Sequence, residues 1–412
     1  MTVDDRFTRS VADWLDDQVG PGTPGYLDDV LARTRQTRQR QWWSSLERWL
    51  PMDLTMRLAP APKLSLLLVV IGLLVALAAI VVVVGSRTRL PAPFGPADNG
   101  AVLYGSDGDI FVMTPDGDRK AIISGSTNDF APYFALDGSK FAFLRATGGP
   151  GQTALMLANA DGSSVHSLTD TLEELSDATW SPTGSHIAVA SRVDNKLSVW
   201  SLDVATGAQK TLVSGMRAES LAWTPDGREL IFRGETVGEA PLTFGLYRVG
   251  ADGSGLHSIR PPTDNGEHWQ NPALSPDGTK IIYTQWDPYI GGRLWVVDLD
   301  GGNLKMLDFD GPLASAYFAS WSADGARIVY HRWTGETFHL AVAPSGGGHA
   351  VNIGPAMPQR GGAARAAFSP DGSKVIARYD GDGSTWILDP DGGPGVLLPP
   401  SAYLASWQRL AP

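Results

Sequence analysis

The chain has 412 residues, with 33 Lys and Arg against 44 Asp and Glu, and a formal net charge of -11. This acidic balance argues against binding to nucleic acid through a basic surface. The absence of cysteine excludes disulfides, thiolate metal sites, iron–sulfur clusters and cysteine nucleophiles. The 47 glycines and 29 prolines are typical of a turn-rich β protein.

Residues 1–62 are expected to form a short cytoplasmic tail with helical segments. Phe7, Val11 and Trp14 recur at helical spacing, and a second helical pattern runs into a basic stretch followed by tryptophans. One interpretation places this tail against the membrane, with tryptophans at the headgroups and arginines facing anionic lipid. The other makes residues 1–50 a docking segment for a cytoplasmic protein partner.

Residues 63–86 are predicted to form a transmembrane helix. Leu64 to Val84 is an almost unbroken run of Leu, Val, Ile and Ala, and Lys63 and Arg87 enclose it without an intervening charge. At about 1.5 Å per residue such a helix spans the hydrocarbon core of roughly 30 Å. A buried globular helix and a cleaved signal peptide fit less well, because the run lacks a polar face and begins far from the start of the chain.

The charges on either side of this segment predict its orientation. The positive-inside rule places the N-terminus in the cytoplasm and the rest of the chain outside, in a single-pass protein of the cell membrane. Residues 87–97 are Pro-rich and are expected to act as a semi-rigid spacer. The basic residues before the helix outnumber those after it: Arg33, Arg35, Arg38, Arg40, Arg48, Arg57 and Lys63 against Arg87 and Arg89.

A repeat dominates residues 98–412. A turn of the type aromatic-Ser-Pro-Asp-Gly recurs about every 46 residues and precedes a short apolar strand, so it is expected to join two strands in a hairpin. A second turn, often Asp-Gly, alternates with it, which gives four strands per repeat, the unit of a propeller blade. The first turn ends at Gly138, Gly184, Gly227, Gly278, Gly325 and Gly372.

The ends of the repeat array predict how the ring closes. The array opens at Val102-Leu103-Tyr104, which matches the second strand of a blade, and it ends at Leu404-Ala405-Ser406-Trp407, which matches a first strand. The C-terminal strand should therefore complete the first blade and leave no open edge. We predict an all-β propeller of seven four-stranded blades, with six or eight as the alternatives.

These repeats resemble the TolB-like (WD-repeat-like) β-propeller family, whose hallmark is the Trp-Ser-Pro-Asp-Gly turn followed by an aliphatic strand. Trp180-Ser181-Pro182-Thr183-Gly184 and Trp223-Thr224-Pro225-Asp226-Gly227 carry the resemblance most fully. It covers residues 98–412 and implies a bacterial envelope protein, here in a membrane-anchored version. The tail also resembles, weakly, those of membrane-bound sigma-factor regulators, without the cysteines of the zinc-binding variant.

Known catalytic signatures are absent from the sequence. It has no Gly-x-Ser-x-Gly elbow, phosphate-binding loop, dinucleotide fingerprint or His-Glu-x-x-His motif. His331 and His339 flank a hairpin, but an isolated pair of histidines is more often structural than metal-binding. Asp107 with Asp109, and Asp380 with Asp382, faintly resemble calcium loops but are better explained as turn residues. We therefore expect no enzyme activity, no metal and no cofactor.

Ligand binding is expected on the propeller face that carries the longer connections. The two short turns of each blade lie at one end of the sheet, so the connections of variable length gather at the other, where function usually resides. Aromatic and ionisable residues are concentrated in those connections: Glu267, His268, Trp269, Trp286, Asp287, Tyr289, Tyr317 and Trp333.

Arginines near the ends of the second strands form another pattern. They either make a basic ring at the funnel mouth, suited to an anion or a carboxylate-rich peptide, or pair with nearby carboxylates and stabilise the blades. The second arrangement is the more ordinary one. The residues are Arg145, Arg192, Arg233, Arg332 and Arg378, with Gln285 in the sixth place.

The sequence thus predicts a membrane-anchored, extracytoplasmic propeller that binds a protein, peptide or cell-envelope ligand without catalysis. One alternative is a transmembrane regulator that couples propeller sensing to a cytoplasmic partner such as a sigma factor. The other is a propeller enzyme acting on glycans or peptides, for which the sequence offers no paired carboxylates or nucleophile at usable spacing.

Overall fold

The structure is a computed structural model, and it describes residues 94–411 apart from 194–195, 237–243, 262–267, 288–290, 311–314, 358–362, 380–381 and 400–401. The predicted tail, membrane helix and most of the spacer lie outside the described residues. In the part of the chain that is described, no helix is long and apolar enough to cross a membrane.

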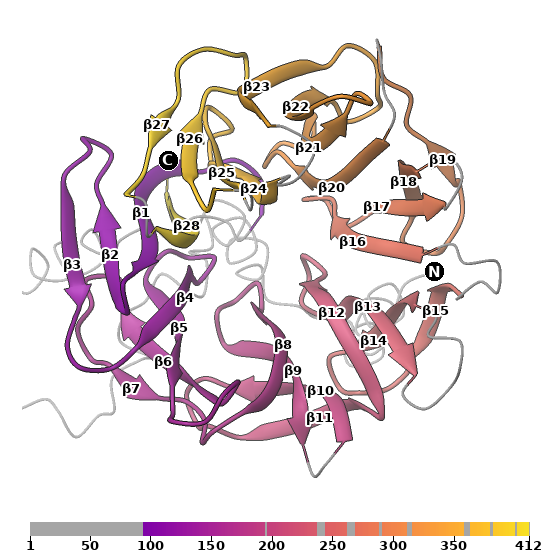
Figure 1. Cartoon of the computed structure of the whole chain (residues 1–412). Helices are drawn as coiled ribbons and strands as arrows, with labels where there is room; N and C mark the ends of the chain where they lie inside the picture. The colour runs from indigo at the N-terminus through magenta and orange to yellow at the C-terminus, as the bar shows by residue number, and fades with distance from the viewer. Residues whose placement is uncertain are drawn as a thin grey trace, which may run out of the picture. The chain divides into compact units, whose positions relative to one another are not determined.

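Seven four-stranded antiparallel sheets form the blades of a propeller (Figure 1). Blade 1 consists of β28 (Tyr403–Leu410), β1 (Asp98–Ser106), β2 (Asp109–Met113) and β3 (Arg119–Ile123). Blade 2 consists of β4 (Asp129–Phe134), β5 (Lys140–Ala146), β6 (Thr153–Asn159) and β7 (His166–Ser167). Blade 3 consists of β8 (Glu173–Trp180), β9 (His186–Val193), β10 (Lys196–Asp203) and β11 (Gln209–Ser214).

Blades 4 to 7 follow in chain order around the ring. Blade 4 consists of β12 (Met216–Trp223), β13 (Glu229–Thr236), β14 (Phe244–Gly250) and β15 (His257–Arg260), and blade 5 of β16 (His268–Leu274), β17 (Lys280–Asp287), β18 (Gly291–Asp298) and β19 (Lys305–Met306). Blade 6 consists of β20 (Ser315–Trp321), β21 (Arg327–Trp333), β22 (Phe338–Pro344) and β23 (Val351–Met357). Blade 7 consists of β24 (Ala363–Phe368), β25 (Val375–Tyr379), β26 (Thr385–Leu388) and β27 (Val396–Leu397).

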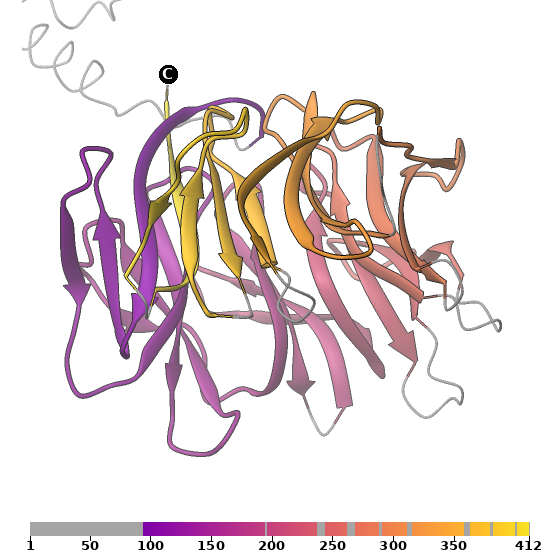
Figure 2. The same cartoon turned by 45° about the horizontal axis from the view of Figure 1, so that its top comes forward.

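The first strand of each blade lies innermost, and the strands run between the two ends of the ring (Figure 2). The hairpin turns between first and second strands and between third and fourth strands lie at one end, which we call the turn end. The remaining connections lie at the other, the variable-loop end.

The ring closes as the sequence predicts. β28, the last strand of the chain, pairs with β1, and Trp407 lies opposite Val102. The predicted count of seven blades and the predicted C-terminal closure are therefore confirmed. Closure stabilises the fold because β28 covers the edge of β1, which would otherwise be unpaired.

A hydrogen-bond network explains the recurring Ser-Pro-Asp-Gly turn. In blade 5, Ser275 Oγ donates to Asp277 Oδ1 at 2.6 Å and accepts from the Lys280 amide at 2.9 Å. Asp277 Oδ1 also accepts from the Thr279 amide at 3.0 Å, and these bonds, led by that from Ser275, hold the pKa of Asp277 below its usual value. Gly278 supplies a positive φ of 72°. Ser275, Asp277 and Gly278 thus each have a distinct role in closing the hairpin.

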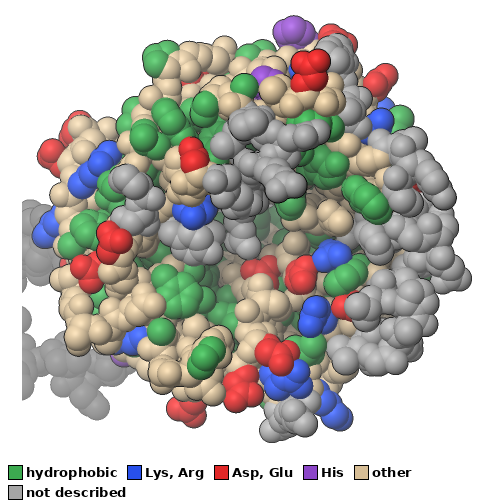
Figure 3. Space-filling model, in the orientation of Figure 1, with side chains coloured by type: hydrophobic (Ala, Val, Ile, Leu, Met, Phe, Trp, Pro, Cys, Tyr) green, Lys and Arg blue, Asp and Glu red, His purple; other side chains and the backbone are tan. Residues whose placement is uncertain are grey.

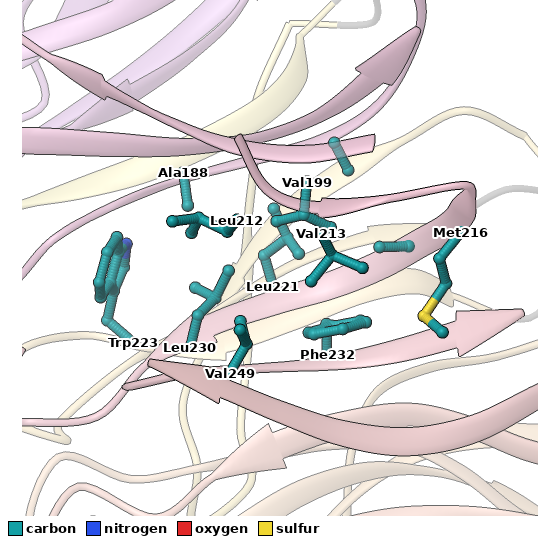
Figure 4. Packing of buried hydrophobic residues seen from close by; sticks show 12 residues of the cluster. Ala188, Val199, Leu212, Val213, Met216, Leu221, Trp223, Leu230, Phe232 and Val249 are labelled. Carbon is teal, nitrogen blue, oxygen red and sulfur yellow. The ribbon is translucent and has the colours of Figure 1, made fainter. Parts of the chain in front are cut away.

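Adjacent blades are held together by apolar packing between their facing sheets. Between blades 3 and 4, Val199 and Leu212 meet Leu230 and Phe232 (Figure 4). Burying an aliphatic or phenyl side chain of this size contributes about 1.5–3 kcal/mol. Indole groups add polar links, as when Trp321 Nε1 donates to the Ala273 carbonyl of the preceding blade at 3.0 Å.

Candidate functional site

The seven inner strands enclose a central cavity of about 540 Å³, a volume within the usual range for small-ligand sites. Alanine, serine and proline form much of its wall, together with Leu144 and Arg378 from second strands. The inner-strand wall includes Pro132, Asp177, Ser220, Asn271, Phe318 and Ser406.

The inner strands carry bulges that shape this wall. The register shifts within β4, β12, β16 and β20, and each shift contains one residue with positive φ, between 49° and 55°. A bulge of this kind bends a strand and re-aims its neighbouring side chains. The four residues occupy equivalent places in their blades and all line the cavity: Ala131, Ser220, Asn271 and Phe318.

Polar side chains of the wall also bind neighbouring blades together. The Asp177 carboxylate accepts from the Ala178 amide and from the Leu221 amide of the next blade, both at 2.8 Å. Ser406 Oγ accepts from the Phe134 amide at 3.2 Å, which links blade 1 to blade 2. These bonds fix the inner strands, so the wall is preorganised.

Three of the five arginines identified in the sequence pair with a carboxylate of the inner strand in their own blade. Arg145 makes two hydrogen bonds to Asp129, at 2.7 and 2.8 Å, and Asp129 is only 1% exposed. The other two pairs are Arg192 with Glu174 at 2.7 Å and Arg233 with Glu219 at 2.6 Å. Burial lowers the pKa of Arg233 despite its carboxylate partner.

The remaining two arginines donate to backbone carbonyls. Arg332 Nη2 donates to the Asp310 carbonyl, and Arg378 Nη1 donates to the Ala402 carbonyl, each at 2.8 Å. Acidic and basic side chains gather beside the centre of the ring, over β8 and β12 (Figure 3). For Arg145, Arg192 and Arg233 the structure therefore shows the ion-paired arrangement rather than a ring of cations alone.

The aromatic residues predicted at the variable-loop end are placed on blades 5 and 6. Trp286 and Asp287 end β17 and are half-buried. The Tyr317 ring lies so close to Gly292 of blade 5 that a Cβ there would clash with it. Trp333 packs on Phe338, with ring centroids 4.5 Å apart. These side chains form part of one end of two neighbouring blades.

Four of the predicted site residues cannot be placed in the same detail. Glu267 and Tyr289 lie outside the described residues, and the side chains of His268 and Trp269, on β16, are likewise not described. His331 and His339 do not face each other as a ligand pair: His331 lies opposite Leu340, and His339 lies opposite Arg332. Among the described residues, no group of three His, Asp or Glu side chains could hold a metal ion.

Phe318 escaped the sequence analysis, and His331 was considered there only as a possible metal ligand. Phe318 lines the cavity with a φ of 55°, and its ring centroid lies 5.1 Å from that of His331. His331 is 3% exposed, and burial lowers its pKa to about 3, so the imidazole is neutral at physiological pH. The available signal was that Phe318 occupies the place where β4, β12 and β16 carry Ala, Ser and Asn.

Comparisons with known proteins agree with this fold. Residues 94–268 match the TolB beta propeller domain family. The oligogalacturonate lyase of Vibrio parahaemolyticus shares 14% identity, with 74% of this chain and 86% of that one covered and a TM-score of 0.54. A prolyl endopeptidase shares 11% identity over 77% of this chain and 51% of its own length, with a TM-score of 0.55.

TolB from Acinetobacter baumannii is a further similar structure. It shares 16% identity, with 76% of this chain and 81% of that chain covered and a TM-score of 0.49. At such low identities the solved structures establish similarity of fold alone. Function therefore has to be argued from the site itself.

Proposed function

The chain carries a TolB-like β-propeller, and from this premise we propose that it is a non-catalytic recognition module for a protein or peptide ligand. The ligand binds at the variable-loop end, and part of it enters the central cavity. The observation that carries this proposal is a preorganised cavity of about 540 Å³ walled by all seven blades. Aromatic residues at the same end, such as Trp286 and Trp333, supply the side chains that protein interfaces favour.

The carboxylates beside the cavity support recognition rather than catalysis. Asp129 and Glu219 are engaged by arginines, and Asp177 accepts two backbone amide hydrogen bonds. A general acid or base must be able to reach a substrate and exchange a proton with it. Side chains committed to holding strands together suit a binding scaffold better.

Site-specific crosslinking tests the location of this binding site. A photoreactive amino acid at position 286, at the variable-loop end, should crosslink the full chain to a protein or peptide in native membranes. The same group at position 300, in a turn at the opposite end, is the matched control and should give no such product. Equal crosslinking from the two positions would contradict the proposal. If the full chain instead crosslinks to a cytoplasmic protein, and this product is lost when residues 1–50 are removed, the regulator function is favoured.

We further propose that residues 63–86 anchor the propeller outside the cytoplasmic membrane. The uncharged apolar run and its arginine-rich N-terminal flank support this topology. Because the chain has no native cysteine, single cysteines can report it directly. In intact cells a membrane-impermeant maleimide should label Asp300→Cys, whereas Arg38→Cys should react only after lysis. The opposite labelling pattern would exclude this orientation.

A further inference from the structure

Phe318 does not fit the pattern of the residues at its position in the propeller. At the equivalent bulges, β4 has Ala131, β12 has Ser220 and β16 has Asn271, each with positive φ. Asn adopts this left-handed conformation more readily than other residues with a side chain, whereas a bulky aromatic residue there is an outlier. The backbone strain is shared by all four positions, and among them Phe318 alone combines it with an aromatic side chain that lines the cavity.

The Phe318 ring covers a buried polar group. His331 is 3% exposed, and its Nε2 has no hydrogen-bond partner among the described residues. The two rings are in contact, with centroids 5.1 Å apart and planes inclined at 51°. An unpaired buried nitrogen carries a desolvation penalty that a suitable hydrogen-bonding group would remove.

Blade 2 shows what happens where the bulge carries a small residue. There Leu144, opposite Phe130 in the ladder, reaches the cavity beside Ala131. His331 holds the equivalent place in blade 6, opposite Tyr317, but here the Phe318 ring forms the wall and His331 lies behind it. Removal or rotation of the Phe318 ring would therefore join His331 to the cavity.

We propose that Phe318 is a displaceable plug over a concealed subsite of the cavity, and that this subsite takes a hydroxyl-bearing aromatic ring such as a tyrosine side chain of a peptide. A phenol ring can replace the phenyl ring of Phe318 against the imidazole. Its hydroxyl then supplies the hydrogen bond that His331 Nε2 lacks. This proposal rests on the proposed function in one respect: the subsite belongs to the central cavity that the ligand is proposed to enter.

The probes are p-cresol, the side-chain analogue of tyrosine, and toluene, that of phenylalanine. Binding is followed in the full chain through the ring NMR signals of isotope-labelled histidine, with His331→Leu identifying the His331 signals. In Phe318→Ala, p-cresol should shift the His331 signals and bind about tenfold more tightly than toluene. Adding His331→Leu should abolish that preference. The wild-type chain should show the same shift at higher p-cresol concentration.

Two further variants serve as controls for folding and for specificity. Phe318→Asn introduces the residue that β16 carries at this place, so a folded chain is expected even if Phe318→Ala is unstable. Phe338→Ala removes a phenyl ring that packs on Trp333 in the same blade and should leave the His331 signals unchanged.

Equal binding of p-cresol and toluene to both Phe318 variants would overturn the subsite. An unchanged wild-type His331 signal at 100 times the p-cresol concentration that half-saturates the Phe318 variant would overturn the displaceable plug. Neither result depends on the protein ligand. If p-cresol binding fails these tests while position 286 still crosslinks to a protein or peptide, the subsite alone is rejected. If p-cresol binds as expected but position 286 gives no specific crosslink, the proposed function alone is rejected.

Discussion

Gly278, in the first turn of blade 5, packs directly on the ring of Pro225 in the same turn of blade 4. A Cβ atom at Gly278 would lie 2.5 Å from Pro225 Cδ and 2.9 Å from its Cγ. The next blade repeats this arrangement more loosely, since a Cβ at Gly325 would lie 3.8 Å from Pro276 Cδ. The proline and glycine of the motif therefore act between blades as well as within a hairpin.

This difference predicts unequal effects of Gly278→Ala and Gly325→Ala. Both glycines have nearly the same φ, 72° and 71°, so each substitution pays a similar left-handed penalty of about 1–2 kcal/mol. Gly278→Ala must also displace Pro225, which should cost roughly 1–3 kcal/mol more. Urea unfolding of the two variants measures this difference. Equal losses would show that the two turns are not tightly packed against each other.

The ion pair between Arg145 and Asp129 should contribute far more to stability than an exposed pair. Arg145→Ala leaves the Asp129 carboxylate, 1% exposed, without its guanidinium and should lower the free energy of unfolding by roughly 3 kcal/mol. Arg228→Ala is the control, because Arg228 and Asp226 are 85% and 57% exposed, and it should cost less than about 0.5 kcal/mol. Chemical denaturation of both variants measures the two losses in the free energy of unfolding. Similar losses would contradict a larger contribution from the pair of Arg145 with Asp129.

The sequence predicts the ring because its turns have specific chemistry and its ends are complementary. Pro-Asp-Gly turns mark the hairpins, and the match between Val102-Leu103-Tyr104 and Leu404-Ala405-Ser406-Trp407 identifies the blade that both ends share. Such signals are local in sequence or repeat at a fixed period. Both remain readable without the structure.

The cavity wall could not be predicted in the same way. A bulge interrupts the alternation of side chains along an inner strand, so the sequence pattern does not tell which residues face the cavity. The sequence pattern identifies Arg145 as one of a series, but its partner Asp129 begins a different strand and follows no motif. Phe318 lies in a strand pattern that predicts neither its positive φ nor its contact with His331.

Removal of β28 should prevent stable ring closure. Deleting residues 403–412 would expose the edge of β1, whose Val102, Leu103 and Tyr104 are at most 2% exposed in the closed ring. The truncated chain should aggregate or unfold well below the wild-type temperature, as measured by size-exclusion chromatography and thermal unfolding. A synthetic peptide of residues 403–412 should partly restore the transition. An unchanged midpoint without the peptide would show that β28 is dispensable.

His331 should make the propeller sensitive to mild acid. Burial lowers its folded-state pKa to about 3, whereas an exposed histidine in the unfolded chain titrates near about 6.5. Between these values the unfolded state binds a proton that the folded state does not. The free energy of unfolding should therefore fall as the pH drops below about 6.5, with a limiting slope of about 1.4 kcal/mol per pH unit.

The substitution His331→Leu isolates this contribution. Denaturation at pH 7 and at pH 5 avoids most carboxylate titration, and wild type should lose about 2 kcal/mol more than the variant between these two conditions. Phe338→Ala serves as the control, because it removes an apolar side chain of the same blade and no titratable group, and it should leave the pH dependence as in wild type. If His331→Leu loses as much stability as wild type between pH 7 and pH 5, the acid sensitivity arises elsewhere, and His331 is not held neutral by burial behind Phe318.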